Sequence, residues 1–343
     1  MTKRTRLFVL VAAGILMVGL GTGLLASYMG VQNLTLIGGN GPAEFAYVPA
    51  DARAVGYANV RAVMDSELRR KLTDLHPGGD HARSFQEQTG IDVENDIDYV
   101  IAAVSGSDPA SGGPPLVLAR GRFDLVRLEG LARQEGGTVE EYKAIRLITH
   151  GDFGVGFMEP GLVAIGTPAA VRRAVDTKSG SATSISGNDE LMRLVRDVDD
   201  GTVWGVARFD SLAGARLPLE LSSKLPAINW FSIKGLINGG VEAQISAEAR
   251  DDVAAQDLRE VIRGFMALAR MQIGQNVELA DLMNSLQLGG QGKTVSLSFS
   301  VPSAMIDALG ALRAHRRPEA PRPAPDAPGP SPEAPQRPAP PAL

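Results

Sequence analysis

The chain of 343 residues has room for about two domains of ordinary size. Its formal net charge of −5 excludes the strongly basic surface that nucleic-acid binding requires. The chain has no cysteine, which excludes disulfides, thiolate metal sites and a cysteine nucleophile. It also contains no cofactor-binding motif.

The N-terminal segment has the pattern of a membrane anchor. Lys3, Arg4 and Arg6 precede the uncharged residues 7–29, which as a helix would be about 34 Å long and could cross a bilayer core of about 30 Å. Basic residues favour the cytoplasmic side. The pattern predicts a cytoplasmic start at 1–6, a transmembrane signal anchor in the inner membrane, and a body outside the cytoplasm.

Two alternatives concern the same segment. A cleaved signal peptide would leave a secreted protein, but the apolar run is longer than a usual signal core and no A-x-A-like site follows it. Gly19 and Gly23 form a G-x-x-x-G pattern, whose spacing lets membrane helices approach closely. Weak self-association through these two glycines therefore stays open.

After a glycine-containing linker at 30–43, the pattern predicts a first α+β half at 44–176. Strand-like runs and helices alternate along this half, and the third helix has Thr167 at its N-cap and Pro168 at its first position. The first strand is predicted around residues 55–59 and the first helix at 66–75. Further strands are predicted at 96–104, 114–123, 138–149, 153–159 and 162–166, and a second helix at 124–134.

Arg-Phe-Asp occurs twice, at 122–124 and 208–210, each time where a strand gives way to a helix or turn. The Asp124 carboxylate can cap the following helix, and Phe123 and Leu128 have the spacing of a hydrophobic staple. Asp210 can also act as a cap, without the staple. The triplet therefore indicates a structural role and not a catalytic one.

A Ser/Gly-rich stretch at 177–188 predicts a linker to a second α+β half at 189–316. This half contains a hairpin signal at 238–240 and a strand at 294–301 whose apolar residues alternate with serines. The helix predicted at 252–271 has one apolar face. The residues of this face are Ala254, Leu258, Val261, Ile262, Phe265 and Ala269.

The order of these elements predicts an α+β fold, with antiparallel sheets and helices packed on one face. Each half has a similar order of strands and helices. The halves can therefore be degenerate copies of one ancestral unit, or they can be unrelated, and the sequence leaves both alternatives open. Residues 317–343 are rich in proline and lack apolar periodicity, which predicts a disordered, extended tail.

Four acidic residues at alternate positions are the first candidate metal site. Asp92, Glu94, Asp96 and Asp98 resemble the first half of an EF-hand loop. The residues that would stand for the turn glycine and the bidentate glutamate are Ile97 and Ala103. A solvated acidic segment leading into a strand is the favoured interpretation, with calcium binding as the alternative.

His150, Asp152 and Glu159 are the candidate catalytic residues. Together they would supply a general base or part of a metal site for a hydrolase. Gly151 and Gly154 instead favour a tight turn in which the histidine and aspartate are ordinary polar residues.

The stretches AYVPADARAVGYANVRAVM and GLVAIGTPAAVRRAVD resemble a group of bacterial membrane-anchored envelope proteins with no assigned activity. The resemblance covers residues 44–176 and implies a single anchor and an extracytoplasmic α+β body. Because the sequence contains none of the common catalytic motifs, we expect a non-enzymatic binding or scaffolding role, with an envelope protein or the cell wall as partner. The alternatives are an anchored envelope hydrolase and a small-molecule or lipid-binding protein.

Overall fold

The computed structural model of the chain describes residues 42–66, 69, 86–87, 89–106, 115–209, 227–237, 240–273 and 283–302. The predicted anchor with Gly19 and Gly23, the juxtamembrane linker up to residue 41, and the proline-rich tail lie outside the described residues. Asp210 and most of the helix predicted at 66–75 also lie outside them. Within the described ranges, no helix combines the length and the apolar character needed to cross a bilayer.

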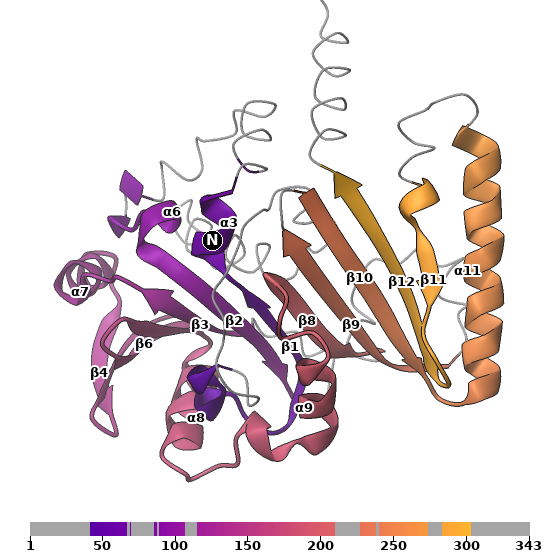
Figure 1. Cartoon of the computed structure of the whole chain (residues 1–343). Helices are drawn as coiled ribbons and strands as arrows, with labels where there is room; N and C mark the ends of the chain where they lie inside the picture. The colour runs from indigo at the N-terminus through magenta and orange to yellow at the C-terminus, as the bar shows by residue number, and fades with distance from the viewer. Residues whose placement is uncertain are drawn as a thin grey trace, which may run out of the picture.

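The fold is α+β, and one large antiparallel sheet organises it (Figure 1). Its twelve described strands lie in the order β11-β12-β10-β9-β8-β1-β2-β3-β7-β6-β5-β4, and each neighbouring pair is antiparallel. The strands are β1 Ala52–Ala58, β2 Ile97–Ser105, β3 Leu116–Gly121, β4 Thr138–Tyr142, β5 Ile145–His150, β6 Phe153–Glu159, β7 Leu162–Gly166, β8 Val203–Arg208, β9 Ile228–Ile237, β10 Gly240–Ala249, β11 Gln287–Gly289 and β12 Thr294–Pro302.

Helices connect the strands and cover parts of both faces of the sheet. The α-helices are α3 Val60–Met64, α6 Val93–Asp96, α7 Leu125–Gln134, α8 Pro168–Lys178, α9 Asp189–Arg196 and α11 Asp252–Ile273. Two short 3-10 helices, η1 Ala43–Tyr47 and η3 Ile185–Gly187, complete the described elements.

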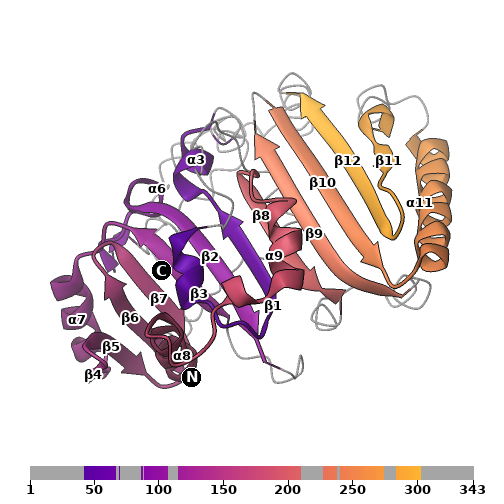
Figure 2. The same ribbon diagram turned by 60° about the horizontal axis from the view of Figure 1, so that its bottom comes forward.

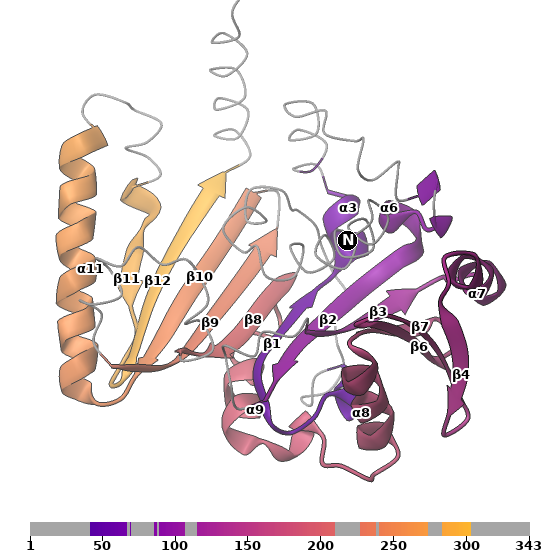
Figure 3. The ribbon, with the colours of Figure 1, turned by 180° about the vertical axis from the view of Figure 1, so that it is seen from behind.

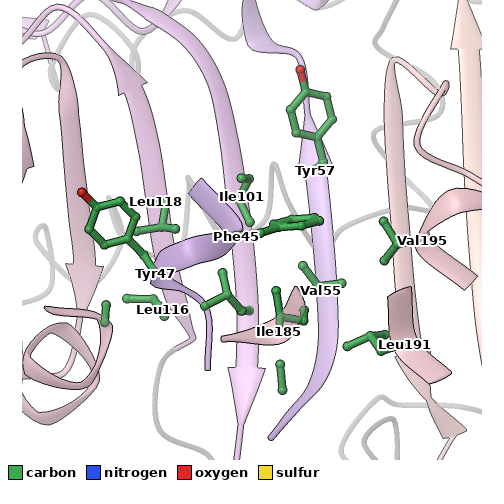
Figure 4. Close-up of a cluster of buried hydrophobic side chains, with 14 of the residues drawn as sticks. Phe45, Tyr47, Val55, Tyr57, Ile101, Leu116, Leu118, Ile185, Leu191 and Val195 are labelled. Atoms are coloured by element: carbon green, nitrogen blue, oxygen red, sulfur yellow. The ribbon is translucent and has the colours of Figure 1, made fainter. Parts of the chain in front are cut away.

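The two faces of the sheet have separate cores. On the face that we call the α8 face, which bears Val55, Ile101 and Leu118, the core includes residues of η1, η3, α8 and α9 (Figure 4). On the opposite face, the α11 face, which bears Val100 and Ala119, the core includes residues of α3 and α7. Figure 3 shows α8 and α9 on one side of the strands and α3 and α6 on the other.

The packing on two faces differs from the expectation of helices on one face. Strands β2, β3 and β7 are almost continuously apolar, so side chains that point to either face must be covered. Strands of the second half such as β12 instead alternate regularly between apolar and polar residues, the pattern of a sheet with one solvent-exposed face.

Local signals set several element boundaries as predicted. The Asp124 carboxylate accepts from the backbone N–H of Arg127 at 3.0 Å and caps α7, while Phe123 and Leu128 pack in the same core. The Thr167 hydroxyl caps α8 in the same way through the N–H of Ala170 at 3.1 Å. Strands β9 and β10 pair from Ile237 and Val241 outward, which confirms the predicted hairpin.

The two predicted halves meet in the middle of the sheet, where β1 pairs with β8. The stretch at 177–188 connects α8 to α9 and packs against the start of the first half. Ile185 is fully buried and donates its backbone N–H to the carbonyl of Val48 at 2.7 Å. Residues 177–188 therefore contribute to the core as well as linking the halves.

Candidate functional site

His150, Asp152 and Glu159 do not form one site. His150 ends β5 and Asp152 lies in the turn before β6, on either side of Gly151, which has a φ of +58°. Glu159 is at the opposite end of β6, which at about 3.3 Å per residue lies roughly 20 Å away. All three side chains are exposed. The strand thus separates His150 and Asp152 from Glu159.

The four carboxylates of the acidic run, Asp92 to Asp98, all bind other groups of the protein through hydrogen bonds or ion pairs. Asp92 caps α6 by accepting from the backbone N–H groups of Glu94 and Asn95 at 3.0 and 3.3 Å. The other three carboxylates each form an ion pair with an arginine. These pairs are Glu94 with Arg69, Asp96 with Arg122, and Asp98 with Arg61.

Arginines therefore neutralise three of the four alternating acids, Glu94, Asp96 and Asp98. In the part of the chain that the structure describes, no three His, Asp or Glu side chains are grouped so that they could hold a metal ion. Sequence spacing alone could not show this, because the arginines come from other elements.

Among the residues that the structure describes, the most buried carboxylate is that of Glu44, which sequence analysis did not single out. It lies in η1 with 2% of its surface exposed. Its Oε1 atom accepts from the Tyr99 hydroxyl at 2.8 Å and from Arg120 Nε at 2.9 Å. Because Tyr99 is in β2 and Arg120 in β3, this carboxylate fixes η1 onto two central strands of the sheet.

Arg120 extends the cluster to the surface. Its guanidinium also donates to Glu159 at 2.6 Å and to the carbonyl oxygen of Pro160 at 3.3 Å. Burial opposes the charged form of Arg120, but the hydrogen bonds that it donates to Glu159 and Glu44 outweigh burial and raise its pKa. The guanidinium thus stays a permanent cation between one buried and one exposed glutamate.

Tyrosines surround this cluster and stay protonated. Burial, followed by the charge of Glu159, raises the pKa of Tyr47 to about 12. Burial together with the hydrogen bond to Glu44 raises the pKa of Tyr99 to about 12, and burial raises that of Tyr57 as well. Such phenols act as hydrogen-bond donors at neutral pH and cannot serve as general bases.

An aromatic column continues from the cluster across the α8 face. Tyr57 stacks on Trp204 with ring centroids 5.8 Å apart and contacts Tyr99 at 5.6 Å. Within the described ranges, two buried polar atoms at this column have no hydrogen-bond partner. They are Glu44 Oε2 and Trp204 Nε1. With its carboxylate neutralised by Arg120, the cluster is suited to holding η1 in place and not to proton transfer.

The α11 face of the second half has a different character. Register places Phe231, Ile233 and Ile237 of β9 on one face with the apolar residues of β10 and β12. These apolar residues are Val241, Ala243, Ile245, Ala247, Val295, Leu297, Phe299 and Val301. The opposite face carries serines, glutamates and Lys234, with Trp230 and Leu236 among them, so it is mainly polar where the α11 face is apolar.

Helices cover the two ends of this apolar face. Val63 of α3 packs against Ile237 and Val241 at one end. Leu258 of α11 packs with Ala247 and Val295 at the other. Between these ends, Ile233, Ile245 and Leu297 are only partly buried. We call these three residues the central apolar patch.

Comparison with known proteins gives no family. No protein-family model and no curated protein matches the chain. Solved structures of a protein named TP0453 match 78% of this chain and 96–97% of their own. Crystal forms I, III and IV have 11%, 8% and 9% sequence identity and TM-scores of 0.41, 0.43 and 0.44. At these values the match carries no inference about function.

Proposed function

We propose that this chain is a single-pass protein anchored in the inner membrane of a bacterium through residues 7–29. Its body lies outside the cytoplasm and works by binding. The basic residues before the apolar run support this orientation. The proline-rich tail at 317–343 is proposed to be an extended arm of the same protein.

Binding is favoured over catalysis by the arrangement of the polar groups. The candidate hydrolase residues lie at the two ends of β6, and three of the four carboxylates of the acidic run are paired with arginines. An anchored hydrolase that uses His150 and Glu159 together would need these side chains within hydrogen-bond reach of one substrate.

The observation that carries the proposal is the central apolar patch. The patch lies on a sheet face that is apolar along all of β9, β10 and β12, and its side chains are only partly covered. An apolar surface bordered by helices suits an acyl chain, which makes lipid the ligand class that this geometry favours.

The arrangement of the halves also supports an internal duplication. In the first half, a three-strand meander (β1–β3) is followed by α7, and the final strand β7 pairs with β3. In the second half, the meander β8–β10 is followed by α11, and the final strand β12 pairs with β10. We propose that the halves are related copies joined along β1 and β8.

Two measurements on the full chain test the proposal. Alkaline extraction of membranes should leave the chain in the bilayer, and protease added outside the inner membrane should digest the body. Recovery of the chain in the soluble fraction, or protection of the body from that protease, would contradict the anchored orientation.

The ligand class is tested by cross-linking. The full chain reconstituted in nanodiscs is exposed to a photoactivatable fatty acid, and cross-linked residues are mapped. We expect labelling at Ile233, Ile245 and Leu297 in addition to the anchor. The variant Ile245→Gln should reduce this labelling, whereas Ser246→Gln, on the opposite face, should leave it unchanged. Labelling confined to the anchor would exclude lipid binding by the body.

A further inference from the structure

The first half of α11 is firmly attached to the sheet. The Asp251 carboxylate caps the helix by accepting from the backbone N–H of Ala254 at 2.8 Å. Arg259 donates to the carbonyl oxygens of Gly292 and Thr294 at 2.9 and 3.0 Å. The last residue of the helix that packs in the core of this region is Ile262.

The second half of the helix exposes large apolar side chains. Phe265, Leu268 and Met271 are 49%, 57% and 80% exposed. Because they are spaced three residues apart, they form one ridge along the helix, which we call the α11 ridge. The helix of 22 residues is about 33 Å long. It lies beside β11, at one edge of the sheet (Figure 2).

The exposed position of Phe265 differs from its predicted place on the buried face. The apolar stripe predicted from sequence is buried at Ala254 and Leu258 but not at its C-terminal end. No described part of the protein covers the apolar residues at the C-terminal end of α11. Core packing therefore does not explain why these residues are apolar.

Charge divides the helix at the same point. The first half carries Asp252, Asp257 and Glu260 against a single arginine, Arg259. Residues 263–273 carry Arg263 and Arg270 and no acidic residue. Both arginines are exposed, and their separation of seven residues places them on one side of the helix, away from the α11 ridge. The protein as a whole is acidic, with a net charge of −5.

We propose that the second half of α11 docks on the surface of an anionic lipid bilayer. The α11 ridge enters the boundary between headgroups and acyl chains, and Arg263 and Arg270 contact lipid phosphates. A helix with an apolar face and arginines on its polar face has the composition of an interfacial membrane helix. This inference rests on the proposed function, which places a bilayer beside the body.

Two observations favour a lipid surface over a second copy of the chain. A ridge of three side chains is much smaller than the roughly 1,200 Å² that a stable protein interface buries. The predicted linker at 30–43 has 14 residues and spans at most about 50 Å, so the body must stay close to the bilayer.

The absence of cysteine allows a direct test. In the full chain, Leu268→Cys is labelled with an environment-sensitive fluorophore, and Val253→Cys serves as the matched control. Val253 is 72% exposed and lies in the first half of the same helix. In vesicles of mixed phosphatidylglycerol and phosphatidylcholine, we expect brominated lipid to quench the label at 268 and leave the label at 253 unquenched.

Charge is tested in the same labelled chain. Each arginine is expected to strengthen docking roughly five-fold at low salt, so Arg263→Gln with Arg270→Gln should sharply reduce the quenched fraction. High salt and vesicles of phosphatidylcholine alone should do the same. All these changes are at exposed side chains, so tryptophan fluorescence of the folded body should not change.

The outcomes separate this inference from the proposed function. Equal quenching at 268 and 253 in chains that float with the vesicles would overturn the docking of α11 and leave the anchor intact. If the label at 268 reports a water-excluded environment that depends on the protein density in the vesicles and not on lipid charge, the helix contacts a second copy of the chain. That result would also overturn the docking of α11 on lipid. Failure of the chain to float with any vesicle would overturn the proposed function itself.

Discussion

Glu44 and Glu159 accept hydrogen bonds from the same guanidinium in opposite surroundings. Glu44 is almost completely buried, whereas the Glu159 side chain is 40% exposed. Removing one partner of a buried ion pair leaves a charge without compensation, but an exposed pair contributes little because water replaces it. Comparing the two ion pairs of Arg120 therefore measures how burial changes the contribution of an ion pair to stability.

We expect Glu44→Gln to lower the free energy of unfolding by about 2–3 kcal/mol, since it leaves the partly buried Arg120 with only its surface partner. Glu159→Gln, the matched control, should cost less than about 1 kcal/mol. Denaturant unfolding of the full chain in detergent can be followed through Trp204 and Trp230, which are both buried. Equal losses for the two variants would contradict a special role for Glu44.

At the scale of elements, the turn between β4 and β5 has a backbone conformation that its two residues adopt rarely. Lys143 and Ala144 have φ angles of +48° and +64°, a region that favours glycine. Contacts of Lys143 compensate, because its ammonium pairs with Asp176 at 2.6 Å and donates to Ser181 at 3.0 Å. The hairpin is thereby tied to the end of α8.

Ala144→Gly should therefore stabilise the protein by about 0.5–1 kcal/mol, because glycine adopts a positive φ without a steric cost. The reciprocal control is Gly151→Ala, at a φ of +58° with open space around the added methyl group. This change should destabilise by a similar amount. Denaturant unfolding measures both, and a loss of stability in Ala144→Gly would show that the turn is not strained.

The same turn shows the limit of sequence prediction for elements. A Lys-Ala pair has none of the usual residues of a two-residue hairpin turn, so residues 138–149 were predicted as one continuous run. The caps at Asp124 and Thr167 were predicted correctly because cap and helix are neighbours in sequence. Glu44 was missed because its partners Tyr99 and Arg120 are 55 and 76 residues away.

At the scale of the molecule, tyrosine ionisation links pH to stability. The unfolded chain releases phenolic protons near the ordinary pKa of 10.0, whereas folded Tyr47 and Tyr99 keep theirs to about 12. Between these values the unfolded state binds fewer protons, so the free energy of unfolding falls as pH rises. Below pH 10 this contribution is fully present.

We expect an ultraviolet titration of the folded protein to show delayed phenolate formation, followed by cooperative unfolding above pH 10. Tyr99→Phe should reduce the slope of stability against pH in this window. Ordinary titration of all tyrosines near pH 10 without loss of structure would contradict the buried environment of the cluster.

The α+β class and most strands of the sheet could be predicted from local patterns, but their assembly could not. Continuous apolar runs such as β2 do not reveal which face a helix will cover, and pairing of β1 with β8 joins segments about 150 residues apart. The point at which α11 leaves the core depends on the strands that it packs against, which no pattern within the helix records.

The central place of β1 has a consequence for the order in which the protein is made. β1 needs two neighbours, and one of them, β2, follows within the same half. The other, β8, emerges only after all of the first half has been synthesised. Until then one edge of β1 is open to other chains, so folding has a vulnerable interval that ends when β8 arrives.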